Sequence, residues 1–251
     1  PHGAVFAADG SRLYVADTGN RRIQVYSAEG EHLETITSAE FQEPVAVALT
    51  PEGDLLVLDA LAQLIYRVRS DRSVEPLPLQ TSFYRPRGLG VAATGDLVVA
   101  DTGGARVVVL APDGSQTLEF GGQGSLVGRG QPVGVLAADG ALWAISAEDG
   151  RLWNLTSDGS LTAVQPTGTL DGPHLAQLSD GRLLASDPGR AAFVLFSPLG
   201  EPLAQFAYAG ELQLPTGIAA TSSAAGHVIA VVDTRACSVS VWRLAEQAAG
   251  G

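Results

Sequence analysis

One stretch of sequence recurs several times along the chain. Residues 15–26 read VADTGNRRIQVY, and residues 99–110 read VADTGGARVVVL. Alignment on a preceding proline gives six copies, which begin at Pro1, Pro44, Pro86, Pro132, Pro173 and Pro215. Successive copies begin 43, 42, 46, 41 and 42 residues apart, close to the roughly 40 to 45 residues of a four-stranded propeller blade. The repeat therefore predicts a ring of six similar units.

Each copy consists of short β-branched and aliphatic runs separated by turn signals. In the first copy we expect strands near residues 3–8, up to Asp17, at 22–27 and at 32–37, with turns at Asp9-Gly10 and Glu29-Gly30. Asp-Gly suits tight hairpins because glycine accepts a positive φ. A four-stranded sheet cannot bury both faces alone, but six packed radially can. The predicted fold is all-β: a six-bladed β-propeller of four-stranded antiparallel blades, forming one domain over residues 1–251.

The sixth copy is incomplete. After SVSVW the chain continues only with RLAEQAAGG, which is a poor outer strand compared with EHLETIT or EPLAQFA in earlier copies. Either residues before Pro1 supply the missing strand, or the ring closes with a three-stranded blade. We favour the first alternative, and a fourth strand formed by residues 244–251 would contradict it.

Composition limits the function classes. The net charge of -12 and the pI near 4.6 disfavour nucleic acid as a partner, because its phosphates are bound by basic surfaces. No apolar run reaches the roughly 18 residues of a membrane span. Because the chain begins with Pro1 and contains no Met, we expect a part of a longer protein, whose missing flank could anchor it. The single cysteine, Cys237, forms no internal disulfide and is expected to be semi-buried.

The pattern P-x-G, then a D-G turn, then LYVADTGNRRIQVY resembles the NHL repeat, over essentially the whole chain. The resemblance is sharpest in the first and third copies. NHL domains of this kind resemble surface sensors, which implies a bacterial, extracytoplasmic protein (periplasmic, cell-surface or secreted) that binds a partner or ligand.

The DTGN loop admits two interpretations. Six such loops could line one face with carboxylates that hold a cation, or each aspartate could accept hydrogen bonds from its own turn and pair with a following arginine. Asp17 and Asp101 each have an arginine five residues later, whereas the second, fifth and sixth copies place leucine, alanine or serine there. The fourth copy keeps Arg151 but has Ser146 in place of the aspartate. Because a metal ring would not tolerate that scatter, we expect the aspartate to be structural.

The residue after each opening proline should lie at the mouth of the central channel. These ring residues are His2, Val45, Arg87, Val133, His174 and Thr216. Propellers place ligand contacts where loops converge on a rigid frame. We therefore expect His2, Arg87, His174 and Thr216 to bind the ligand or partner, with Arg21, Phe83, Tyr84 and Arg85 nearby.

Two motifs, Pro1-His2 and Pro173-His174, resemble those of the peptidyl-hydroxyglycine amidating lyases, whose propellers hold zinc with such histidines. The next alternate copy supplies Arg87, which is not a metal ligand, and zinc needs three or four protein ligands. The gluconolactonases, which hold a central calcium with carboxylates and amides, resemble this chain in architecture. No Glu or Asn occupies the ring positions here.

We expect a non-enzymatic recognition or scaffold propeller without a cofactor, part of a larger protein or assembly, which binds a protein or a small anionic ligand. The alternative is a metal-dependent lyase or hydrolase, with zinc or calcium in the channel and His2 and His174 as metal ligands.

Overall fold

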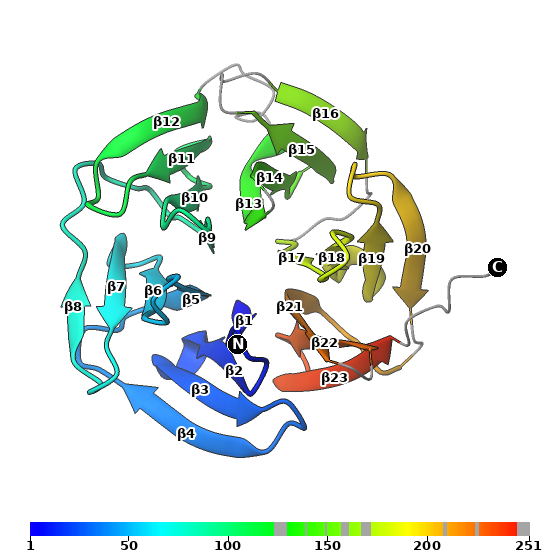
Figure 1. Ribbon diagram of the computed structural model, residues 1–251, viewed down its shortest axis with the longest axis horizontal. Coiled ribbons are helices and arrows are strands. Elements are labelled where there is room, and N and C mark those ends of the chain that lie inside the picture. The colour runs from blue at the N-terminus through cyan, green and yellow to red at the C-terminus, as the bar shows by residue number, and fades with distance from the viewer. Residues whose placement is uncertain are drawn as a thin grey trace.

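The computed structural model describes residues 1–122, 130–138, 140–148, 150–156, 161–166, 172–207, 210–223 and 226–244. Six antiparallel sheets stand around a central axis, which confirms the predicted all-β, six-bladed propeller (Figure 1). Each sheet follows chain order from the axis outward. Within the described residues, no helix is long and apolar enough to cross a membrane.

The innermost strands begin close to the repeated prolines. They are β1 (Ala4–Phe6), β5 (Pro44–Leu49), β9 (Gly88–Val91), β13 (Pro132–Ala138), β17 (Leu175–Gln177) and β21 (Pro215–Ser223). The second strands return toward the channel mouth and end at the repeated aspartate or its serine counterpart: β2 (Arg12–Asp17), β6 (Leu55–Asp59), β10 (Leu97–Asp101), β14 (Ala141–Ser146), β18 (Leu183–Asp187) and β22 (Gly226–Asp233).

The third and fourth strands complete the blades. The third strands are β3 (Arg22–Ser27), β7 (Leu64–Val68), β11 (Arg106–Leu110), β15 (Arg151–Leu155), β19 (Ala192–Phe196) and β23 (Ser238–Leu244). The outermost strands are β4 (His32–Thr37), β8 (Val74–Pro76), β12 (Gln116–Gly121), β16 (Leu161–Pro166) and β20 (Pro202–Ala207). Short 3-10 turns, Thr18–Asn20 and Pro188–Arg190, join the second and third strands of the first and fifth blades.

Among the described residues the sixth blade has three strands, in the order β21-β22-β23, and the expectation that residues before Pro1 supply its fourth strand stays a prediction. The possible fourth strand at residues 244–251 falls, apart from Leu244, outside the described residues. Leu244 itself is the last residue of β23 and pairs with His227 of β22.

The core lies between adjacent blades rather than within one. Alternate side chains of each blade pack against the preceding and the following blade, as in the cluster of Val25, Ile36, Val57 and Tyr66 between the first two blades. Because a sheet buries both faces only when a neighbour covers each of them, the blades stabilise one another around the ring.

Candidate functional site

The six predicted ring residues meet at one cavity. His2, Val45, Arg87, Val133, His174 and Thr216, together with Gly172, line a space of about 30 Å³ at the start of the innermost strands. That volume is enough for a few water molecules at most. The structure therefore brings together all the residues that the sequence placed at the channel mouth, and it leaves little room among them.

The glycine of the P-x-G motif sets this close packing. A Cβ atom on Gly217 would lie 1.9 Å from the carbonyl oxygen of His2 in the next blade, and one on Gly88 would lie 2.2 Å from that of Val133. The Gly3 N–H donates to the carbonyl oxygen of Val45 at 2.9 Å. Glycine is required because the backbone of the following blade occupies the place of a side chain.

Both channel histidines are uncharged at neutral pH. Burial, followed by the positive charges of the Pro1 amine and Arg87, lowers the pKa of His2 to about 4. Burial, followed by His2 and Arg87, lowers the pKa of His174 to about 3. Nδ1 of His2 lies 3.2 Å from the Thr18 hydroxyl. At pH 7 the two imidazoles therefore offer hydrogen bonds to a ligand and no charge.

Thr216 lines the cavity, but its hydroxyl is already engaged. Its Oγ1 lies 2.6 Å from the Thr234 hydroxyl, which donates to the Pro1 carbonyl oxygen at 2.6 Å. Thr216 itself is almost fully buried. Its hydroxyl therefore helps to join the last blade to the first. Thr234 was not among the predicted residues, although its place directly after Asp233 matches Thr18 after Asp17.

Ser186 is a second residue that the sequence analysis missed. Its hydroxyl donates to the Thr216 carbonyl oxygen at 2.5 Å and accepts from the His174 N–H at 2.8 Å. The side chain is fully buried. Ser186 thereby fixes the backbone of two ring residues in adjacent blades. The only sequence signal is a serine before Asp187, where the first and third copies have alanine.

Arg87 is exposed at the rim, close in sequence to other exposed groups. Tyr84 is 55% exposed, and the Arg85 guanidinium carbon lies 5.8 Å from the centre of its ring. The Tyr84 N–H donates to Asp101 Oδ1 at 2.6 Å, which holds this loop on the third blade. Phe83, expected among the contacts, is instead buried in the core between the second and third blades, because the loop turns its ring inward.

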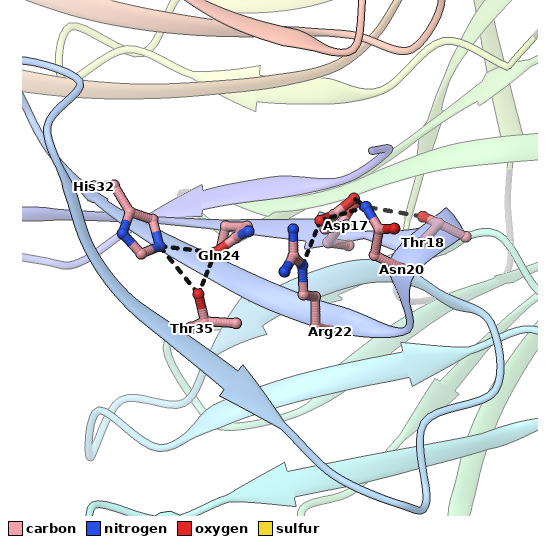
Figure 2. Close-up of polar contacts among 8 residues, drawn as sticks. Asp17, Thr18, Asn20, Arg22, Gln24, His32 and Thr35 are labelled. Atoms are coloured by element: carbon pink, nitrogen blue, oxygen red, sulfur yellow. Dashed lines mark hydrogen bonds and ion pairs between the residues drawn. The ribbon is translucent and has the colours of Figure 1, made fainter.

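The repeated aspartates are structural, as the sequence analysis expected. Asp17 accepts from Asn20 Nδ2 and from Arg22 Nε, the latter at 2.7 Å (Figure 2). Asp59 is fully buried and accepts four backbone N–H groups, from Gln42, Glu43, Leu61 and Ala62. Each carboxylate thus joins the turn after it to other backbone or side-chain donors, so its oxygens are not directed to a shared cation.

The donor set at the cavity does not match a zinc or calcium site. Two imidazoles are fewer than the three or four protein ligands that zinc takes, and calcium prefers oxygen ligands in larger number. Arg87 adds a positive charge beside them. Within the described ranges, no group of three or more His, Cys, Asp or Glu side chains is arranged to hold a metal.

The far end of the channel is wide and apolar. The later parts of the innermost strands and the turns after them enclose about 820 Å³, lined by residues such as Ala48, Val91, Ala137, Ala176 and Ala219. This cavity was not predicted. Its sequence signal is the run of small apolar residues that follows the P-x-G positions, as in VALT, VAAT and LAAD.

Solved structures with the same fold have low sequence identity to this chain. The nidogen/laminin complex aligns with a TM-score of 0.73 at 18% identity, over 87% of this chain and 83% of that chain. A streptogramin B lyase aligns with a TM-score of 0.70 at 16% identity, over 98% and 84%. Catalytically inactive virginiamycin B lyase from Staphylococcus aureus gives 0.69 at 15% identity, over 91% and 76%. Likeness at this identity establishes the fold alone.

Sequence comparison is more specific. No curated protein matches the chain. A family model described as outer membrane protein assembly factor BamB matches residues 69–242, which is more than half of the chain and runs from the second blade to the sixth. The chain therefore belongs to the family of the outer membrane protein assembly factor BamB.

Proposed function

We propose that the protein is a non-enzymatic recognition propeller of the NHL type, formed by the whole chain, that acts within an extracytoplasmic assembly. Two findings support this proposal. The family is described as an outer membrane protein assembly factor, and the repeat carries the NHL-like pattern LYVADTGNRRIQVY. A rigid ring that presents converging loops suits recognition, because binding then costs little ordering of the protein.

The recognition surface in this proposal is the face around the channel mouth. The observation that carries it is a set of exposed arginines on the loops and turns of this face: Arg21, Arg85, Arg87 and Arg235. Among the described residues, none of these four forms an ion pair. Such guanidinium groups are available to a carboxylate. The proposed ligand is therefore an acidic segment of a protein partner, or a small anion that shares its carboxylate chemistry.

The opposite face differs in charge. The turns that follow the innermost and third strands carry exposed carboxylates, among them Asp9, Glu29, Glu52, Asp113 and Asp180. The mouth face also carries exposed glutamates, namely Glu40, Glu43, Glu148 and Glu211, but its unpaired arginines offset them. An acidic partner is therefore repelled less at the arginine-bearing face than at the opposite face, so the distribution of charge favours approach to the mouth. Tyr84 and Arg85 are the residue types that most often anchor protein interfaces.

Site-specific photo-crosslinking tests this proposal. A benzoylphenylalanine at Tyr84 is expected to crosslink to one partner in cells, whereas the same group at Leu199, which is 76% exposed on the opposite face, is expected not to. Arg85→Glu together with Arg87→Glu should abolish the Tyr84 product. Arg12→Glu, on the opposite face, is the matched control and should retain it. Equal crosslinking from both positions, or a product insensitive to charge reversal, would contradict the proposal.

The second candidate is a metal-dependent lyase or hydrolase. The observation in its favour is that His2 and His174 share one cavity and are unprotonated at pH 7, as metal ligands must be. Elemental analysis of the purified protein beside a His2→Ala/His174→Ala variant distinguishes the two. One tightly held zinc that the variant loses would favour the enzyme. No bound metal in either sample, combined with the arginine-dependent crosslink, would favour recognition.

A further inference from the structure

The wide end of the central channel lies outside the proposed recognition surface. It encloses about 820 Å³, whereas the ring residues at the mouth leave about 30 Å³ between them. Drug-sized molecules bind in cavities of roughly 300 to 1,000 Å³. A molecule of that size fits only the wide end, and it must enter from the face opposite the mouth.

The side chains of the cavity wall are mostly small and apolar. Alanines of the innermost strands and of the turns after them recur around it, among them Ala7, Ala48, Ala92, Ala137, Ala176 and Ala219. Among the described residues that line the cavity, the polar side chains are Asp9, Tyr14, Thr50 and Gln177, and only Asp9 is charged. Water finds few hydrogen-bond partners on alanine or valine side chains. An apolar group that replaces it there is therefore stabilised.

The innermost strands also direct backbone groups into this space. In the sheets that the structure describes, each of them is an edge strand nearest the axis and pairs only with the second strand of its blade (Figure 1). Every second residue of such an edge directs its N–H and C=O away from the paired strand. The Ala7 N–H donates to the Arg12 carbonyl oxygen at 2.8 Å, so the backbone groups of Phe6 are directed toward the axis. Carbonyl oxygens beside an apolar wall accept hydrogen bonds from an alcohol or an ammonium group.

Negative charge lies on one side of the opening. The turns after β1, β5 and β9 read AADGS at residues 7–11, TPEGD at 50–54 and AATGD at 92–96, and none of them contains a basic residue. Asp9 itself lines the cavity, and Glu52 lies between two lining residues, Pro51 and Gly53. The opening is therefore acidic in three consecutive blades, at the positions where a bound molecule would reach solvent.

Three carboxylates of these turns are not neutralised. In the described ranges, Asp9, Glu52 and Asp96 form no ion pair, whereas Asp54 lies 3.7 Å from the Nε of Arg67. Arginine groups elsewhere on this face have other carboxylates beside them, as Arg182 has Asp180 at 2.6 Å and Arg12 has Glu34 at 3.9 Å.

Asp9 is ordered as well as charged. The Ser11 N–H and hydroxyl donate to Asp9 Oδ1 at 2.9 Å and 2.7 Å, and these hydrogen bonds lower the pKa of Asp9 below its usual value. Asp96 accepts from the Thr94 hydroxyl at 2.7 Å. Because these bonds fix the carboxylates within their own turns, little ordering is needed when a cation binds.

We propose that the wide end of the channel binds a small organic cation. The ligand places an apolar body against the alanine-rich wall and an ammonium group at the opening, beside Asp9, Glu52 and Asp96. An organic anion of the same shape is repelled by these carboxylates, and a neutral molecule gains only the contact with the wall. The two ends of the channel thus select opposite charges, because the mouth face bears the unpaired arginines.

A series of three fluorescent probes tests the charge preference. 1-Pyrenemethylammonium, 1-pyrenemethanol and 1-pyreneacetate share one apolar body and differ in the charge of one group. Fluorescence anisotropy at low ionic strength should show one site that binds the ammonium probe at least about tenfold more tightly than the acetate, with the alcohol between them. Salt at about 1 M should bring the three affinities closer together. Equal affinities at low salt, or no binding of the ammonium probe, would overturn the proposal.

Neutral variants distinguish the opening from the acidity of the whole chain. Asp9→Asn/Glu52→Gln/Asp96→Asn should weaken the ammonium probe about tenfold or more and leave the alcohol unchanged. The matched control removes three exposed carboxylates from the outer turns of the same face, as Glu29→Gln/Glu31→Gln/Glu201→Gln, and should bind the ammonium probe like wild type. Equal weakening by both triple variants would mean that only the net charge attracts the probe, and would contradict a site at the opening.

Thiol protection tests whether the apolar body lies inside the cavity. Ala93→Cys, in the turn after β9, and Ala137→Cys, within β13, replace residues that line the cavity, each in a Cys237→Ser background. Saturating 1-pyrenemethylammonium should slow the reaction of both thiols with iodoacetamide. The control is Leu199→Cys, which is 76% exposed in an outer turn of the same face, and its reaction rate should not change. Unchanged rates at both cavity positions would show that the cation binds on the surface only, and the proposed site would be wrong.

Discussion

The Thr234 hydroxyl donates a 2.6 Å hydrogen bond to the Pro1 carbonyl oxygen, and so joins the last blade to the first. The same hydroxyl lies 2.6 Å from Thr216 Oγ1. The other neighbouring blades follow one another along the chain, whereas the first and sixth blades do not, so this polar contact adds to the packing that holds these two blades together.

Thr234→Val is expected to destabilise the protein by about 1 to 2 kcal/mol, because it leaves the Pro1 carbonyl and the Thr216 hydroxyl without this partner. Thr234→Ser keeps the hydroxyl and should lose less than half of that. Denaturant unfolding measures both free energies. A valine variant as stable as wild type would show that water replaces the bond.

Gly217→Ala is expected to destabilise the ring by up to about 3 kcal/mol, because its Cβ would overlap the His2 carbonyl oxygen at 1.9 Å. Gly19→Ala is the control, since a Cβ there meets no atom within 4 Å. Thermal unfolding of both variants checks the prediction, and equal stability would mean that the sixth blade shifts outward without cost.

Asp59→Asn is expected to cost about 2 to 4 kcal/mol. The carboxylate accepts four backbone N–H groups, and an amide nitrogen in place of one oxygen would face donors. Asp54→Asn, which is partly exposed beside Arg67, should change stability by less than about 1 kcal/mol. Urea unfolding compares the two, and similar losses would refute a special role for Asp59.

Stability should fall as the pH drops below about 6.5. The pKa values of His2 and His174 in the folded protein are about 4 and about 3, below the unfolded value, so the unfolded state binds more protons in this window. The stabilisation present at pH 7 is lost progressively toward pH 4 and pH 3. His174→Gln should reduce the slope of the unfolding free energy against pH, by about one proton. An unaltered slope in His174→Gln would contradict this assignment.

The fold could be predicted from the sequence because the residues that begin the blades and form the turns recur at regular spacing. The opening prolines, the Asp17-type residues and the turn glycines fixed the strand order and placed His2, Arg87, His174 and Thr216 at one mouth. What the sequence could not predict depends on three-dimensional surroundings. Phe83 is buried because the second and third blades enclose it. Cys237, expected to be semi-buried, is exposed because it lies in the turn before β23, where Arg21 and Gln63 of the first two blades are exposed as well.

Backbone conformation was also hidden from the sequence. The residue before the third strand adopts a positive φ in every blade: Arg21, Gln63, Ala105, Gly150, Ala191 and Cys237. Only one of the six is glycine. The two flanking strands hold this turn closed, so non-glycine residues adopt the left-handed conformation although it costs roughly 1 to 2 kcal/mol. The residue type at this position therefore does not reveal the conformation.

The close contacts of glycines between neighbouring innermost strands determine the width of the channel mouth. Because backbone meets backbone at Gly88 and Gly217, the aperture cannot widen without separating whole blades. A ligand larger than a few water molecules must therefore contact the rim residues from outside, or enter from the apolar end. The channel is therefore narrow at its mouth, about 30 Å³, and wide at its other end, about 820 Å³, so only the wide end has the volume of a typical small-molecule site.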